Sequence, residues 1–145
     1  MELKLPPPVI FLSCALLMKF MPKLGVFNCH ISIIIVVICV AIIIDMMSLW
    51  VFFKEKTTAS PFNPNKTSTL VTYGIYGVTR NPMYLSLAMY LFAWGLWLGN
   101  SVSLVGIVLF CLYITYFQIY PEERYLEKQF GEMYRQYKKR VRRWI

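Results

Sequence analysis

The apolar run from Ile31 to Phe53 limits most strongly what this chain can fold into. It is long enough to cross about 30 Å of hydrocarbon as a helix, and a lone segment satisfies its backbone hydrogen bonds there only as a helix. Of the 145 residues, 58% are hydrophobic and 15% are charged, a balance typical of membrane proteins. We therefore expect an all-α, polytopic membrane helix bundle.

Three further apolar runs accompany this one. Residues 8–27 form the least regular run, because two lysines and a proline interrupt it. Residues 83–98 and 102–120 are separated by a short break around Gly99, so they predict a tight helical hairpin. We expect about four transmembrane helices in one domain, residues 1–145: two N-terminal helices (8–53), a cytosolic connector (54–82), a transmembrane hairpin (83–120) and a cytosolic basic helix (121–145).

Beyond Pro121 the hydrophobic pattern changes. The apolar residues now recur every three or four positions, which predicts one apolar stripe on a charged helix. Pro121 suits the first turn of such a helix, and the basic residues between 138 and 143 suit its C-terminal end. We expect this amphipathic helix to lie against the protein or against anionic lipid at the membrane surface. The stripe consists of Leu126, Phe130, Met133, Tyr137 and Val141.

Positive charge predicts the orientation in the membrane. Eight of the 15 Lys and Arg residues fall within residues 121–145. An even number of crossings separates this tail from the connector, so the positive-inside rule places both in the cytosol. We expect a multi-pass protein with its active site and C-terminus on the cytosolic side, in a bacterial inner membrane rather than the endoplasmic reticulum.

Two polar stretches, 54–84 and 118–145, therefore meet at one end of the predicted bundle. They bring Arg80, Glu122 and Glu123 together with several tyrosines beside an apolar interior. Carboxylates and aromatic faces favour a sulfonium or ammonium group, and an arginine favours a carboxylate. In the structural alternative, the tyrosines anchor the interface, the basic residues set topology and the glutamates begin a helix. The residue types alone leave both interpretations open.

Asp45 stands inside the second apolar run. An intramembrane carboxylate is costly unless it faces a polar partner or a wet cavity. Asp45 is therefore a candidate substrate contact if it faces a cavity, and a structural residue if a neighbouring group pairs with it.

The sequence lacks the residue patterns that metal binding, phosphate binding and nucleophilic catalysis require. The four cysteines show no CxxC spacing, and His30 is the single histidine, so no metal site is expected. The chain has no HExxH motif, Gly-rich phosphate loop or Ser/His/Asp set. An adjoining membrane explains the basic tail better than nucleic acid does, so we expect no nucleic-acid partner.

Two motifs carry a resemblance to a known family. The first runs from Leu70 to Tyr84 and reads LVTYGIYGVTRNPMY. The second begins at Glu122 with EERYLEKQFG and ends at Val141 with YKKRV. Together with the hairpin between them, they resemble the isoprenylcysteine carboxyl methyltransferase family, a resemblance that extends to the phospholipid methyltransferases.

The resemblance implies an integral membrane enzyme that transfers a methyl group from S-adenosylmethionine without a metal. The donor would enter from the cytosol and a lipid-like acceptor from the bilayer. Candidate catalytic residues are Glu122, Glu123 and Arg80, with a glutamate orienting the donor or taking a proton from an acceptor amine or hydroxyl. Gln118 and Asp45 are the candidate substrate contacts. The implied donor contacts are Ser68, Thr69, Leu70, Val71, Tyr76, Asn81, Pro82, Met83, Tyr84 and Glu122.

The sequence departs from the carboxyl methyltransferases at three positions. Asn81 and Ser68 stand where histidines are common, and Gln118 stands where that branch has an arginine for the prenylcysteine carboxylate. A neutral amide holds a carboxylate poorly, so we expect a lipidic or small amphiphilic acceptor of unassigned chemistry. The alternatives are a phospholipid N-methyltransferase, a reductase of related architecture, and a non-catalytic membrane protein whose basic tail binds anionic lipid or a partner protein.

Overall fold

The computed structural model describes residues 5–55 and 69–145 and is mainly helical. Within this part, β-type pairing is limited to two isolated bridges, so the predicted all-α class is confirmed. The elements are α1 (Pro7–Phe20), α2 (Ile31–Lys54), η2 (Gly74–Gly77), α3 (Pro82–Leu98), η3 (Ser101–Leu104), α4 (Val105–Ile114), η4 (Thr115–Ile119), α5 (Tyr120–Phe130) and α6 (Glu132–Arg140).

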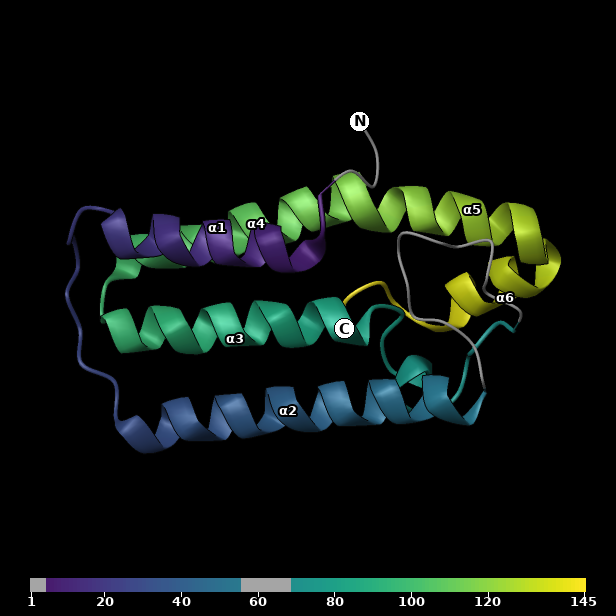
Figure 1. Cartoon of the computed structure of the whole chain (residues 1–145), viewed down its shortest axis with the longest axis horizontal. Coiled ribbons are helices and arrows are strands. Elements are labelled where there is room, and N and C mark those ends of the chain that lie inside the picture. The colour runs from purple at the N-terminus through teal and green to yellow at the C-terminus, as the bar shows by residue number, and fades with distance from the viewer. Residues whose placement is uncertain (1–4, 56–68) are drawn as a thin grey trace.

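Helices α1, α2, α3 and α4 lie side by side as a bundle, and α5 and α6 gather at one end of it (Figure 1). The largest core cluster fills the space between α1, α3 and α4, where Met18, Leu91 and Phe110 are almost completely buried. Helix α2 packs along α3 and buries the small residues Ala41 and Ser48. Most large apolar side chains of α2 remain on the outside of the bundle.

Glycines let α1 approach its neighbours closely. A Cβ added to Gly106 of α4 would lie 2.3 Å from Cγ of Met18, and one added to Gly95 of α3 would lie 3.2 Å from Cε of the same side chain. Met18 is only 1% exposed, so it has little space in which to move aside. Small residues at helix contacts are a common device in membrane bundles. They anchor the short α1 against both α3 and α4.

The predicted hairpin between α3 and the following helix is present. Gly99 ends α3 with a φ of 61°, a left-handed conformation that favours glycine. A Cβ there would also lie 2.5 Å from the carbonyl oxygen of Phe27. The Asn100 side chain accepts a hydrogen bond from the Leu24 N–H and donates one to the Pro22 carbonyl. These contacts join the α1–α2 loop to the hairpin turn.

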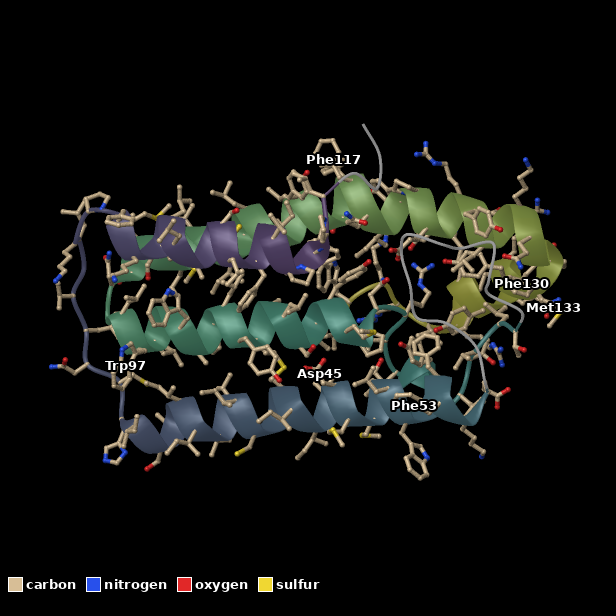
Figure 2. All side chains as sticks on the ribbon, in the orientation of Figure 1. Asp45, Phe53, Trp97, Phe117, Phe130 and Met133 are labelled. Atoms are coloured by element: carbon tan, nitrogen blue, oxygen red, sulfur yellow. The ribbon has the colours of Figure 1, made fainter. Side chains whose placement is uncertain are left out.

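The apolar helices indicate a membrane protein. Two helical stretches, Ile31–Lys54 and Ser101–Phe130, are long and apolar enough to cross a membrane, whereas α1 and α3 are apolar but shorter. Large apolar side chains cover the outer faces, including Phe53, Trp97 and Phe117 (Figure 2). Such an apolar surface suits lipid better than water. Four crossings and a cytosolic tail remain predictions.

Helix α5 begins at Tyr120 with Pro121 in its first turn, as the sequence predicted, but it continues from the preceding helix without a loop. One helix runs from Ser101 to Phe130, a length of about 45 Å. Proline lacks an N–H, and its ring clashes with the carbonyl four residues earlier in a regular helix. The π-helical turn Thr115–Ile119, just before Pro121, provides the local adjustment that lets the helix continue. The polar α5 is therefore a direct extension of the apolar α4.

The prediction of one unbroken basic helix over residues 121–145 was wrong. The polar helix breaks at Gly131, whose φ of 54° and ψ of −123° favour glycine. The second piece, α6, ends at Arg140, and residues 141–145 are outside the helices. Arg142 instead pairs with Thr79 in a parallel bridge. The chain after Arg140 therefore turns back to the bundle, which local helical periodicity does not reveal.

The apolar stripe of the tail packs mainly on the protein. Tyr134, Tyr137 and Val141 are buried in one cluster, with Leu70 and Phe130 packed around them. Of the two surroundings expected for the stripe, the structure therefore supplies protein for most of it. The exception is Met133, which is 66% exposed beyond Phe130 (Figure 2).

We predict that Gly106→Ala lowers the stability of the bundle, because the new methyl group collides with the buried Met18. Overpacking of this kind costs about 1–3 kcal/mol, measurable as a lower midpoint of thermal unfolding in detergent. Gly77→Ala is the matched control, since its nearest contact would be an ordinary 3.7 Å. Equal midpoints for the two variants would contradict close packing of α1 on α4.

Candidate functional site

Residues 69–81 lead into α3 and pack against the end of α2. Val71 and Tyr76 are buried together with Val51. The Tyr76 hydroxyl lies 2.6 Å from Oγ of Ser48, one turn further into α2. Burial raises the pKa of Tyr76, so this side chain remains a neutral phenol at physiological pH. Apolar packing and one hydrogen bond therefore fix Tyr76 against α2.

Tyr84 and Glu122 join the first turn of α3 to the first turn of α5. Pro82 begins α3, in the first turn, where a missing N–H costs nothing. Tyr84, two residues later, is buried. The Tyr84 hydroxyl donates a 2.5 Å hydrogen bond to Oε1 of Glu122. The charge of Glu122 also acts on Tyr76, whose pKa it helps to raise. Two predicted donor-contact tyrosines and one predicted catalytic carboxylate are thus close neighbours.

Glu123 is the centre of a buried ion network. Both of its carboxylate oxygens accept hydrogen bonds from Arg143, from Nε and from Nη2, each at 2.9 Å. These bonds raise the pKa of Arg143. Nη1 of Arg80 lies 3.2 Å from Oε1 of Glu123, and the Arg80 side chain is only 9% exposed. Nε and Nη1 of Arg80 have no hydrogen-bond partner among residues 5–55 and 69–145. The site therefore holds a buried guanidinium with N–H donors that the described residues do not use.

Helix α6 closes the site from the outside. Its Tyr137 hydroxyl donates a 2.7 Å hydrogen bond to the Tyr76 carbonyl. Burial raises the pKa of both Tyr134 and Tyr137, so both remain neutral hydroxyls at physiological pH. The tail thereby supplies a hydrogen-bond donor to the Tyr76 carbonyl, a backbone acceptor of η2.

Asp45 is paired within the bundle. It extends from α2 into the space toward α3 (Figure 2), where Ser86 donates a hydrogen bond to Oδ1 and Tyr90 donates one to Oδ2 at 2.9 Å. The sequence left two alternatives for Asp45, a residue facing a cavity or a residue paired with a neighbouring group. The structure shows the paired arrangement. Both partners are neutral, so Asp45 joins α2 to α3 through hydroxyl groups.

Gln118 lies in the π-helical turn and is 1% exposed. Its Nε2 donates a 2.7 Å hydrogen bond to the Leu5 carbonyl, which holds the start of α1. Its Oε1 has no hydrogen-bond partner within the part of the chain that the structure describes. The observed contact of Gln118 is therefore with the N-terminal segment, and its role toward a substrate stays a prediction.

The remaining predicted donor contacts differ in their surroundings. Thr69 is exposed, Leu70 and Met83 are half-buried, and Ser68 lies outside the described residues. The amide group of Asn81 donates a 2.9 Å hydrogen bond to a backbone carbonyl of the tail. The part of the site that the structure assembles most completely is thus the group around Tyr76, Tyr84 and Glu122.

Sequence reasoning missed several residues that build this region. Their shared feature is that each forms its contact across a long separation in the chain, so the local sequence does not reveal the partner, even for residues that lie within a motif. Trp94 of α3, for example, donates its indole N–H to the carbonyl of Ala15 in α1. The missed site residues are Ser48, Thr79, Tyr137, Arg143 and Trp144.

The phospholipid methyltransferase family matches residues 29–133. The chain belongs to this family. The match begins just before α2 and ends in the first turn of α6. It therefore covers Tyr76, Tyr84 and Glu122, the group that the geometry brings together.

Two relatives extend this finding. A protein of Haemophilus influenzae, itself described as uncharacterised, is 57% identical over 63 residues, which are 43% of this chain and the whole of that protein. A protein-S-isoprenylcysteine O-methyltransferase of Schizosaccharomyces pombe is 40% identical over 80 residues, 53% of this chain. The match spans 33% of the length of that yeast enzyme. No solved structure matches the chain significantly.

We predict that Tyr137→Phe destabilises the protein, because the buried Tyr76 carbonyl loses its donor. The expected loss is about 1 kcal/mol of unfolding free energy, measured by denaturation in detergent micelles. Tyr116→Phe is the control, since Tyr116 is 59% exposed. Equal stability of both variants would show that the Tyr137 hydroxyl contributes nothing to holding η2.

Proposed function

We propose that this protein is an integral membrane methyltransferase that transfers a methyl group from S-adenosylmethionine to a lipidic or small amphiphilic acceptor. The observation that carries the proposal is the pairing of Tyr84 with Glu122 beside the buried Arg80, at one end of an apolar bundle. Family membership supports the reaction class. The yeast relative, a protein-S-isoprenylcysteine O-methyltransferase, supports methyl transfer to a lipidated acceptor as one form of this reaction.

The residues fit the charges of the methyl donor. S-adenosylmethionine carries a carboxylate, an ammonium and a sulfonium. Arg80 has buried N–H groups that form no hydrogen bond with the described residues, and such groups suit a carboxylate. Glu122 and the rings of Tyr76 and Tyr84 suit the two cationic groups. The donor contacts that we propose are Thr69, Leu70, Val71, Tyr76, Asn81, Pro82, Met83, Tyr84 and Glu122, together with Ser68 outside the described residues.

Methyl transfer requires little covalent chemistry from the protein. When bound, S-adenosylmethionine supplies a methyl group activated by its positive sulfur. The chain aligns the two reactants and keeps water away, and such alignment can supply much of the rate enhancement. Buried apolar residues beside the site, such as Val71 and Ile119, exclude water. No nucleophile of the enzyme is required.

The two glutamates have different surroundings, and we assign them different roles. Glu123 is held by Arg80 and Arg143, so we assign it to holding Arg80 in place. Glu122 has a neutral hydroxyl partner, Tyr84, and we assign it to orienting the donor. Glu122 also takes the proton if the acceptor is an amine or hydroxyl. A carboxylate acceptor needs no base.

We place the site on the cytosolic side of a bacterial inner membrane, with four helices crossing. The basic residues that cluster at the α6 end support this orientation. The exposed apolar faces of α2 and α4 are suited to lipid, so an acceptor can approach within the bilayer. Anionic lipid headgroups are the proposed partners of the exposed basic residues of α6.

We predict that the purified protein binds S-adenosylhomocysteine and that Glu122→Gln weakens this binding about tenfold or more, through loss of a buried charged contact. Isothermal titration calorimetry in detergent or nanodiscs gives both affinities. Glu132→Gln is the matched control, because the Glu132 side chain is 62% exposed. Wild-type protein without affinity would overturn the proposed function. Equal affinity of the two variants would remove Glu122 from the donor site.

We also predict transfer of a labelled methyl group from S-adenosylmethionine into the lipid fraction when the protein is incubated with bacterial membrane lipids. Thin-layer separation of the labelled products identifies the acceptor class. Phosphatidylethanolamine and a prenylated cysteine, tested separately, distinguish the N-methyltransferase and carboxyl methyltransferase alternatives. Donor binding without transfer to any lipid or amphiphile would contradict the proposed acceptor class.

A further inference from the structure

Residues 141–145 form a short segment, here named the tail strap, that leads from α6 back to the start of α3. The C-terminus accordingly lies beside that end of α3 (Figure 1). The strap lies beyond residues 29–133, the part that the family match covers. Its contacts nevertheless fall on the elements that carry the candidate site.

The backbone of the strap fixes the residues just before α3. The Arg80 N–H donates to the Arg142 carbonyl at 3.0 Å, and Thr79 pairs with Arg142 in a parallel bridge. The next carbonyl, that of Arg143, accepts hydrogen bonds from the Asn81 side-chain amide at 2.9 Å and from the Thr79 hydroxyl at 3.3 Å. The orientation of the Asn81 side chain is therefore set by the strap.

The side chain of Arg143 reaches the helix that carries the glutamates. Its two hydrogen bonds to Glu123 satisfy both carboxylate oxygens, and its guanidinium lies 4.6 Å from the centre of the Tyr120 ring. Arg80 approaches the same carboxylate without forming a hydrogen bond through Nη1. Without Arg143, Glu123 would be a buried carboxylate with poorly aligned partners, which is costly.

Trp144 gives the strap a second attachment to the same helix. Its indole N–H donates a 3.2 Å hydrogen bond to Oγ1 of Thr115, the first residue of the π-helical turn. Its ring packs against the core cluster that contains Tyr84 and Ile119. The strap thus contacts the long helix at the first residue of its π-helical turn and again beyond that turn, at Tyr120 and Glu123.

We propose that Arg143 and Trp144 are positioning residues of the methyl-donor site, which clamp the segment Thr79–Asn81 to the helix that carries Glu122. The inference rests on the proposed function, since it assigns these residues to donor binding. Neither residue supplies a reacting atom. The apolar clusters of the bundle and of α6 do not include Arg143, so its removal loosens the clamp while those clusters remain packed.

The test compares donor-site affinity among full-length variants. Arg143→Ala is expected to weaken S-adenosylhomocysteine binding about tenfold, by loss of a buried charged contact. Arg143→Lys keeps the charge but not the two-point geometry, so its affinity is expected to fall between those of wild type and Arg143→Ala. Trp144→Phe keeps the ring packing and loses the bond to Thr115. Arg140→Ala removes the same charge from an exposed position and serves as the control.

Calorimetry gives the affinities, and hydrogen exchange without ligand gives a second readout. Faster exchange at residues 79–84 in Arg143→Ala, with the bundle helices unchanged, supports the clamp. Affinity equal to that of Arg140→Ala overturns it. If Arg143→Ala does not fold, wild-type affinity in both Arg143→Lys and Trp144→Phe overturns it, and weakened affinity in either supports it. If the wild-type protein does not bind S-adenosylhomocysteine, the proposed function is overturned, and the clamp proposal that rests on it is overturned too. If the wild-type protein binds and only the clamp variants behave like Arg140→Ala, the clamp alone is overturned.

Discussion

The buried carboxylate of Glu123, held by two arginines, is the interaction on which the end of this bundle depends. Burying an ion pair is unfavourable unless its geometry is good and its remaining polar atoms are satisfied. Arg143 provides that geometry through two hydrogen bonds of 2.9 Å, and Arg80 adds a second positive charge. The three residues come from the tail, the connector and α5. Three separate parts of the chain must therefore assemble for the charge of Glu123 to be tolerated.

The other polar residues of the apolar bundle follow the same physical requirement. Asp45 is satisfied by hydroxyl groups of α3, Tyr76 by Ser48 of α2, and Glu122 by Tyr84. Interhelical hydrogen bonds of this kind contribute modestly to stability in membranes. They also fix which faces of α2, α3 and α5 meet. Polar side chains are thus paired inside the bundle while its outer faces stay apolar.

This arrangement suits the methyl transfer proposed for the protein. Methyl transfer from an activated sulfur needs alignment and exclusion of water more than covalent help. The proposed donor residues occupy the region that the family match covers. The tail strap lies outside that region, yet it bonds to Asn81 and to the partner of Arg80. The proposed donor site and the docked tail are therefore physically linked in this chain.

The sequence by itself determined the helical class, the long span of α2, the hairpin turn at Gly99 and the motif residues around Tyr84 and Glu122. These follow from local properties: apolar run length, turn chemistry and residue patterns read along the chain. The resemblance to methyltransferases was also visible there, and the family match confirmed it.

The tertiary structure decided where the tail goes. Hydrophobic periodicity predicted one helix over residues 121–145, because such a pattern does not reveal the break at Gly131. It also does not reveal the π-helical turn that joins α5 to the apolar helix before it. It also gave no signal that Arg143 would bind Glu123 or that Asp45 would find hydroxyl partners on α3. Those pairings join residues 20 and 41 positions apart. Their formation depends on how the elements pack, because a buried charge selects whatever partners the fold brings within reach.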